Sequence, residues 1–420
     1  MRIAILLVLT LVFSSFSVFA QKKLVFTDQA YEEQIKTIML YPASEAARAN
    51  LQPAAVPFQK QNLLLEFDDI QDSRNNYSAK LIHCTYNWTK STLMDLDFMS
   101  EYNEITLDDY ENSSSLFLPY VHYRFEVPRV KIPGNYLLII YRDGDKEDLI
   151  LSKRMMVYDP RAGLMQDNQL LGNGALQATN QQINFTVSYQ GLQVLNPMEM
   201  IHVVIRQNQR WDNARMDVKP SFIREDVSQL EYRFFDQDKQ FSAGNEFRFV
   251  DFRSLNFPGQ NTGTLNRSTK PFELYVQPEK SREGLAYAQY KDLNGRYAIE
   301  NTDYQDGYVS GNYIFVNFQL TTRQVNGEVY VNGALNNWQR NDDNRMTYNP
   351  AKSAYEARML LKQGWYNYEY WTESKTLPGN YLEGSHFETE NIYDVLVYYK
   401  SLQPNADLLI GYFSIAVNPR

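Results

Sequence analysis

Short segments in which apolar and polar residues alternate with a period of two dominate this sequence. Such alternation puts every second side chain on the same face of an extended strand, as is typical of strands buried on one face. The clearest examples are residues 185–189, 202–206, 247–251, 272–276 and 313–318. Two further segments, residues 136–141 and 395–399, are apolar almost throughout and fit strands in the middle of a sheet.

Turn chemistry separates these segments. Pairs such as Asn326-Gly327 and Asn332-Gly333 supply residues that accept the positive φ angles of tight turns. Strands at short spacing with little helical periodicity predict an all-β fold of tandem immunoglobulin-like, E-set-like β-sandwich domains.

Helix is expected in two short connectors only. In residues 91–100, Ser91 is a candidate N-cap, with Leu93, Leu96 and Phe98 facing inward. The second candidate covers residues 45–50.

Two interruptions of the strand pattern predict domain boundaries. The first covers residues 159–177 and is rich in Gly and Pro, and the second lies near residues 301–311. We therefore expect a first β-sandwich at residues 21–160, a second at 161–302 and a third, E-set-like one at 303–420.

The N-terminus has the pattern of a secretory signal peptide over residues 1–20. Arg2 precedes an apolar run from Ile3 to Phe13, and Ala20 precedes the expected cleavage point. The run is too short to span a bilayer, and no later run approaches the roughly 20 apolar residues that a membrane helix needs. The sequence thus predicts an exported protein without direct membrane insertion.

Composition narrows the possible partners. Cys84 is the only cysteine in 420 residues, so no intramolecular disulfide is expected and stability must come from packed cores. The net charge of -9 argues against nucleic acid and anionic membrane surfaces as partners. The 31 Tyr, 23 Phe and 5 Trp fit strands and suit a binding surface.

No set of residues predicts catalysis. The four histidines are scattered without metal-ligand spacing, and we expect Cys84 to pack as a small apolar residue. Asp68-Asp69 fits a turn at a strand end better than a catalytic or calcium site, although a hydrolase that uses Asp69 stays open. The sequence therefore predicts a non-enzymatic protein with no cofactor, no metal and no small-molecule substrate.

Several blocks of residues together resemble one family, the plug proteins of the type IX secretion system. In the N-terminal third these blocks are residues 83–93, 101–102, 109–110, 120–123 and 134–136. Further along they are residues 207–208, Trp211, and residues 244–248, 292–295, 361–364, 366–368, 383–387 and 389–391. Each block is short, and their order and number carry the resemblance.

The resemblance implies a periplasmic protein at the inner face of the outer membrane. Its partner would be the outer-membrane translocon β-barrel of type IX secretion, whose periplasmic opening it would seal when no cargo is engaged. As contact residues we expect loop aromatics, namely Trp88, Tyr102, Tyr110 and Trp211, because aromatic anchors dominate many protein interfaces.

An alternative is an exported carbohydrate-binding protein. Residues 327–338 resemble the opening of glycogen-binding and related immunoglobulin-like modules, in which an exposed Trp stacks on sugar rings. Trp338 and Trp365 would then form the platform. The competing interpretation, which we favour, is that Trp338 packs at the edge of a sandwich, since the pattern marks a fold more than a ligand.

Overall fold

The computed structural model describes residues 22–44, 48–114, 117–167, 178–233 and 240–419. It confirms the all-β prediction, with 46% strand and 6% helix in several antiparallel sheets. The predicted signal peptide, residues 1–20, lies outside the described residues.

The N-terminal unit, residues 22–158, is a β-sandwich. Its strands are β1 (Gln29–Ala30), β2 (Ile35–Pro42), β3 (Ala55–Pro57), β4 (Leu63–Asp69), β5 (Tyr77–Cys84), β6 (Ile105–Thr106), β7 (Asp109–Asn112), β8 (Val121–Glu126), β9 (Gly134–Arg142) and β10 (Leu149–Tyr158). One sheet has the order β1-β10-β9-β5-β6, with β3 also on β10, and the other has the order β2-β4-β8-β7. Leu65 and Phe67 of the second sheet share a core with Leu138 and Ile140 of the first.

The middle unit is a second sandwich. Its strands are β11 (Gly163–Asp167), β12 (Asn180–Gln181), β13 (Asn184–Ser188), β14 (Ile201–Gln207), β15 (Phe222–Arg224), β16 (Gln229–Tyr232), β17 (Phe241–Ser242), β28 (Asn391–Leu402) and β29 (Asn405–Val417). The sheets β11-β13-β16-β15 and β14-β28-β29 pack on each other, and Phe185, Val203 and Val395 meet in their common core.

The third unit is built on a ten-stranded sheet. Its strands are β18 (Arg248–Asp251), β19 (Thr262–Asn266), β20 (Glu273–Val276), β21 (Glu279–Lys280), β22 (Tyr297–Ile299), β23 (Tyr313–Thr321), β24 (Glu328–Asn332), β25 (Arg345–Asn349), β26 (Ala354–Lys362) and β27 (Gly364–Glu373). The path β18-β27-β24-β25-β26-β23-β20-β19 is extended by β21 on β23 and β22 on β27. We call this the ten-stranded unit.

Strand pairing does not follow the predicted boundary between residues 302 and 303. The C-terminal strand β28 pairs with β14 of the middle unit and β29 pairs with β28, whereas β18 and β22, which precede the boundary, pair with β27. The turn signals near residues 301–311 mark where strands end, but they contain no information about which distant strand each one joins. The middle unit is therefore made of two separate stretches of the chain, one before and one after the ten-stranded unit.

The helices are single turns: α1 (Asp95–Phe98), α2 (Pro197–Met200), α3 (Gly307–Ser310), and the 3-10 turns η1 (Ala49–Leu51), η3 (Glu225–Val227) and η5 (Ala334–Asn336). The predicted helix near residue 95 exists, but its N-cap is Met94, not Ser91, and Leu96 is exposed to solvent instead of facing inward. Phe98 is buried as expected. Within the described ranges, no helix is long and apolar enough to cross a membrane.

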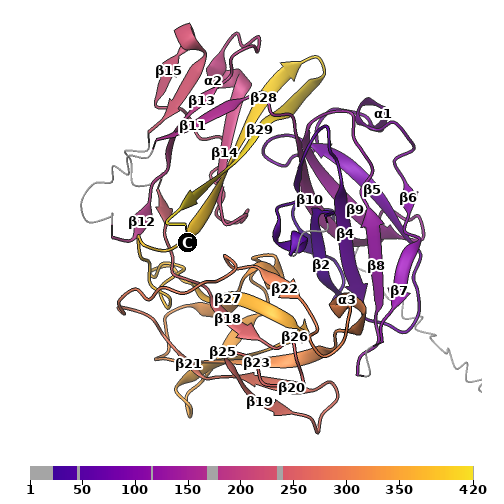
Figure 1. Ribbon diagram of the computed structural model, residues 1–420, viewed down its shortest axis with the longest axis vertical. Coiled ribbons are helices and arrows are strands. Elements are labelled where there is room, and N and C mark those ends of the chain that lie inside the picture. The colour runs from indigo at the N-terminus through magenta and orange to yellow at the C-terminus, as the bar shows by residue number, and fades with distance from the viewer. Residues whose placement is uncertain (1–21, 45–47, 115–116, 168–177, 234–239, 420) are drawn as a thin grey trace, which may run out of the picture.

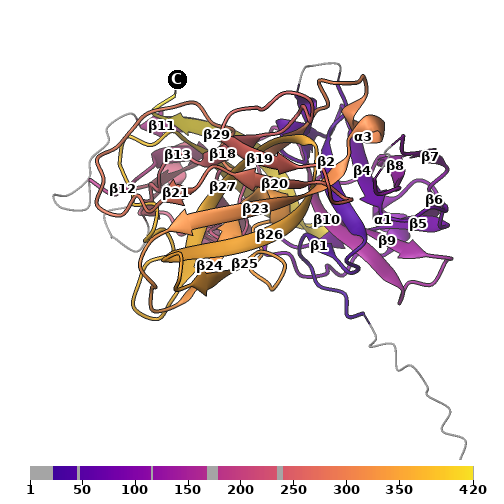
Figure 2. The same ribbon diagram turned by 90° about the horizontal axis from the view of Figure 1, so that it is seen from below.

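The three units meet around a common centre (Figure 1). The N-terminal unit (indigo to violet) touches the ten-stranded unit (orange) along β2 and α3, as Figure 2 also shows. Apolar clusters cross the joints: Met39 and Tyr41 belong to the core of the ten-stranded unit, and Cys84 and Leu137 cluster with Leu396 of the middle unit. Because apolar clusters span both joints of the N-terminal unit, this unit cannot swing away from either neighbour without exposing apolar surface.

Candidate functional site: the joint of the three units and the exposed loops

A buried ion pair locks the N-terminal unit to the ten-stranded unit. Lys362 Nζ of β26 lies 2.7 Å from Asp68 Oδ2 of β4, and both side chains are 0% exposed. The Tyr313 hydroxyl donates to the same oxygen over 2.6 Å, and a ring nitrogen of His122 lies 2.7 Å from Asp68 Oδ1. Burial alone would raise the pKa of Asp68, but Lys362 and His122 hold it below its usual value of 3.8.

The pair Asp68-Asp69 does not form the predicted turn. Both residues end strand β4 and are buried, because each carboxylate has its own polar partners in the interior. Asp69 accepts hydrogen bonds from the Tyr77 hydroxyl at 2.6 Å and from the Asn75 amide at 3.1 Å. Asp68 thus binds across the joint between two units, and Asp69 forms hydrogen bonds within the N-terminal sandwich.

Stacked aromatic and guanidinium groups join the N-terminal and middle units. The rings of Trp88 and Trp211 meet edge to face, with centroids 5.1 Å apart. The guanidinium carbons of Arg154 and Arg206 lie 4.9 Å and 4.5 Å from the Trp211 ring. Trp88 has a φ of 62°, a conformation that bulky residues rarely adopt, so its packing must hold it there.

The middle and ten-stranded units are tied together by Arg210. Its guanidinium donates to Glu369 Oε1 over 3.1 Å and covers the Trp338 ring at 4.0 Å. Arg210 and Glu369 are both buried. Buried ion pairs thus lie at both joints of the ten-stranded unit, one with the N-terminal unit and one with the middle unit.

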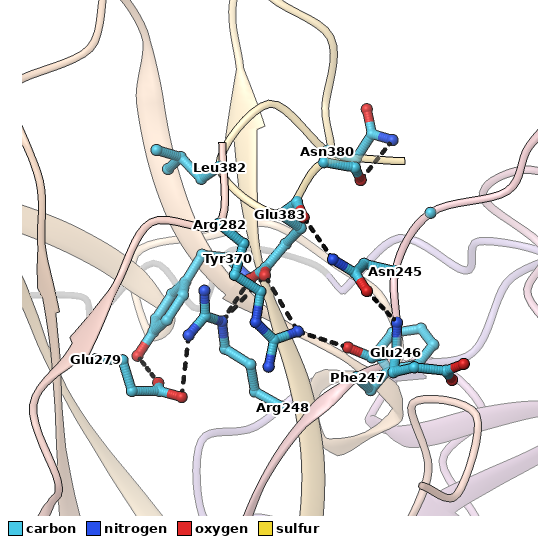
Figure 3. Close-up of polar contacts among 12 residues, drawn as sticks. Asn245, Glu246, Phe247, Arg248, Glu279, Arg282, Tyr370, Asn380, Leu382 and Glu383 are labelled. Carbon is cyan, nitrogen blue, oxygen red and sulfur yellow. Dashed lines mark hydrogen bonds and ion pairs between the residues drawn. The ribbon is translucent and has the colours of Figure 1, made fainter. Parts of the chain in front are cut away.

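Within the ten-stranded unit, Arg248 forms the centre of a further buried network (Figure 3). Its Nε lies 2.8 Å from Glu383 Oε1, and its Nη1 lies 3.1 Å from Glu279 Oε1. Glu383 also accepts the backbone N–H of Tyr370 over 2.8 Å, which fixes the loop after β27 to the sheet. Glu279 Oε2 also accepts a hydrogen bond from the Tyr370 hydroxyl over 2.6 Å.

A cavity of about 320 Å³ lies where the three units meet. Its wall includes Lys153, Arg154, Arg206 and Arg296, with Asp28 as an acidic neighbour. Asp28 lies 3.0 Å from an Arg154 nitrogen, and Arg154 and Lys153 offset its burial, so its pKa falls to about 2. Among the residues that the structure describes, no three His, Cys, Asp or Glu side chains could hold a metal ion.

The four predicted contact residues fall into two pairs. Trp88 is 6% exposed and Trp211 is half-buried, so both support the joint and are badly placed to meet a partner. Tyr102 is 76% exposed, and Tyr110 is partly covered by Arg74, whose guanidinium lies 4.4 Å from its ring. Tyr102 and Tyr110 are the two exposed residues of the four.

Trp338 and Trp365 do not form an exposed platform. Trp338 is buried between Arg210 and Phe247, and Trp365 stacks on Phe249 with ring centroids 4.8 Å apart. A sugar-binding Trp needs a free ring face, which Trp338 lacks. The burial agrees with the packing role favoured from the sequence.

Cys84 is also buried, and burial raises the pKa of its thiol to about 12, as suits a packed apolar residue. Sequence reasoning missed the joint roles of Asp68, Lys362 and Arg210. No local signal identifies them, because the ion-pair partners across the joints are 294 residues apart for Lys362 and Asp68 and 159 residues apart for Arg210 and Glu369.

Comparison with known proteins places the N-terminal unit in a family. Residues 35–159 match the family model described as the type 9 secretion system plug protein 1st domain. The whole fold is similar to the crystal structure of a hypothetical protein from Parabacteroides merdae, at 25% sequence identity and a TM-score of 0.86, covering 94% of this chain and 100% of that chain. No protein with a curated description matches. Residues 35–159 therefore belong to the family of type 9 secretion system plug protein first domains, which supports the resemblance to type IX secretion plug proteins seen in the sequence.

Proposed function

We propose that this protein is a periplasmic plug that binds the outer-membrane translocon β-barrel of type IX secretion and closes its periplasmic opening while no cargo is engaged. The family match of residues 35–159 is the observation that carries the proposal. Plug-family membership also suggests a non-enzymatic role and a location at the outer membrane.

The construction of the molecule supports a steric role. A plug must keep its shape against a large opening, and here apolar clusters cross both joints of the N-terminal unit, while buried ion pairs cross both joints of the ten-stranded unit. Interiors of this kind have low compressibility. Stiffness therefore belongs to the whole molecule and not only to each sandwich.

Isolation of the native complex tests binding. A C-terminally tagged, full-length chain is expressed in its own host, outer membranes are solubilised in mild detergent, and bound proteins are identified by mass spectrometry. The expected result is a very large outer-membrane β-barrel of the secretion system. Repeated recovery of the tagged protein without this barrel would refute the proposal.

Sealing needs a separate measurement. We expect a deletion strain to admit a large hydrophilic antibiotic that the intact outer membrane excludes, and the gene in trans to restore exclusion. A Lys352→Met variant, changed at an exposed ion pair, serves as the matched control and should restore exclusion fully. A deletion strain no leakier than its parent would contradict the sealing role.

A further inference from the structure

The most exposed aliphatic side chains of the described chain are gathered at one end of the molecule. Leu195 is 87% exposed, Leu96 is 83%, Met94 is 75% and Leu402 is 70%. They belong to three separate places in the sequence: α1, the residues just before α2, and the turn between β28 and β29. We call Met94, Leu96, Leu195, Met198 and Leu402 the end face.

These three places are neighbours in space. Figure 1 shows α1, α2 and the β28–β29 turn together at the upper end. Leu93 and Val194, each next to an exposed member of the end face, pack against the same core, which also contains Leu408 of β29. The Tyr399 hydroxyl donates to the Gln193 carbonyl over 2.9 Å, which fixes the segment before α2 to β28.

The end face is held in place and is not a set of loose loops. Asp97 Oδ2 accepts the backbone N–H of Met94 over 2.7 Å, and Lys131 Nζ donates to the Leu96 carbonyl over 2.7 Å. Asn196 caps α2 by accepting the backbone N–H of Met198 over 3.1 Å. Presenting several large apolar side chains to water from fixed backbone costs free energy, which a partner would recover.

Charge narrows the kind of partner. Asp97, Glu101 and Glu199 are exposed acidic residues around the end face, whereas Asp95 is paired with Lys80. Two exposed lysines also lie here, Lys131 at the Leu96 carbonyl and Lys400 close to Leu402 in β28. The whole chain carries a net charge of -9. An anionic lipid surface is thus a poor fit, whereas a protein surface with apolar residues flanked by Lys and Arg is a good one.

We infer that the end face docks onto the translocon, at an apolar surface of the barrel's periplasmic rim that is edged by basic side chains. This inference rests on the proposed function and adds which surface of the plug makes the contact. Docking buries Leu96, Leu195 and Leu402 at its centre, and Glu101 and Glu199 face basic groups at its margin. Such an interface has an apolar centre and a polar rim and can separate again.

Matched variants test the inference by co-isolation from outer membranes. The end-face variant combines Leu96→Ser, Leu195→Ser and Leu402→Ser. The control variant combines Phe257→Ser, Leu285→Ser and Tyr304→Ser, which are 75%, 57% and 66% exposed but belong to the ten-stranded unit. Equal thermal midpoints of both variants and the wild type show that folding is unaffected.

We expect the end-face variant to recover at least about tenfold less barrel than the wild type, since truncating central apolar anchors weakens interfaces by this order. The control variant should recover as much as the wild type. Glu101→Lys combined with Glu199→Lys should also lower recovery, and more so at low salt. Undiminished recovery with the end-face variant, or an equal loss with the control, overturns the inference.

Failure of the inference and of the proposed function are distinguishable. If the wild type recovers no barrel, the plug role itself fails, whereas recovery by wild type and end-face variant alike removes only the inference. Two further outcomes would overturn it: a dimer by light scattering that becomes a monomer in the end-face variant, or co-sedimentation with phosphatidylethanolamine and phosphatidylglycerol vesicles that only this variant loses.

Discussion

Replacing Lys362 by Met should destabilise the protein through the charge that it leaves behind. The substitution keeps a side chain of similar volume in β26 but removes the cation 2.7 Å from Asp68, where neither side chain is exposed. Breaking a buried pair by removal of one partner costs about 3–5 kcal/mol, because the remaining charge is buried without compensation. His122 contacts the other Asp68 oxygen and can be protonated, so we expect the lower end, about 3 kcal/mol.

The assay is urea unfolding followed by tryptophan fluorescence and by far-ultraviolet circular dichroism. Four proteins form a cycle: wild type, Lys362→Met, Asp68→Asn and the double variant. Because the double variant buries no lone charge, its loss of unfolding free energy should be smaller than the sum of the single losses by about 2 kcal/mol. Lys352→Met, at an exposed pair with Glu356 of the same 2.7 Å length, should cost less than about 0.5 kcal/mol.

Two results would refute the reasoning. Either Lys362→Met unfolds within about 1 kcal/mol of the wild type, or the cycle gives no coupling between Lys362 and Asp68. Each would mean that the joint between the N-terminal and ten-stranded units does not depend on this ion pair.

Three further predictions concern other described contacts. Burial lowers the pKa of His122, but Asp68 and Glu66 outweigh this effect and raise the pKa above 6.5. The stabilising contribution of His122 is therefore complete below pH 6.5 and is lost as the pH rises through the raised value. Urea midpoints at pH 6 and pH 8.5 should differ less in His122→Gln than in the wild type. Glu383→Gln should lower the unfolding free energy by about 3 kcal/mol because it leaves Arg248 short of a buried counter-charge, while Glu283→Gln at the surface should leave the urea midpoint unchanged. Trp88→Ala should lower the thermal midpoint by the equivalent of about 3 kcal/mol, whereas Tyr102→Ala should not change it; equal midpoints for the two variants would contradict the structural role of Trp88.

The sequence was informative wherever a structure depends on neighbouring residues. Alternation at residues 185–189 and 313–318 correctly predicted strands β13 and β23, since the pattern of one strand records which face is buried. The apolar run at residues 136–141 lies in β9, the middle of its sheet. The all-β class followed from these local signals.

The predictions that were wrong concern contacts between residues far apart in the sequence. Strand β28 was expected in the last sandwich because it follows β27 in the chain, but it pairs with β14, roughly 190 residues earlier. Trp88 has the sequence context of a loop aromatic, but it is buried in a cluster that includes Trp211 and Leu396 of the middle unit. Leu96 was expected to face inward because an isolated amphipathic turn offers no way to tell a core face from an exposed one.

Because β28 pairs with β14 and β29 pairs with β28, the ten-stranded unit is an insertion within the middle sandwich. Strands β28 and β29 must therefore be synthesised before the middle sandwich can be completed. Contacts of such large sequence separation form slowly, since the entropy of closing a long loop is lost before the contacts compensate for it. During synthesis the N-terminal sandwich can fold early, but the three units can pack together completely only after β28 and β29 have been synthesised.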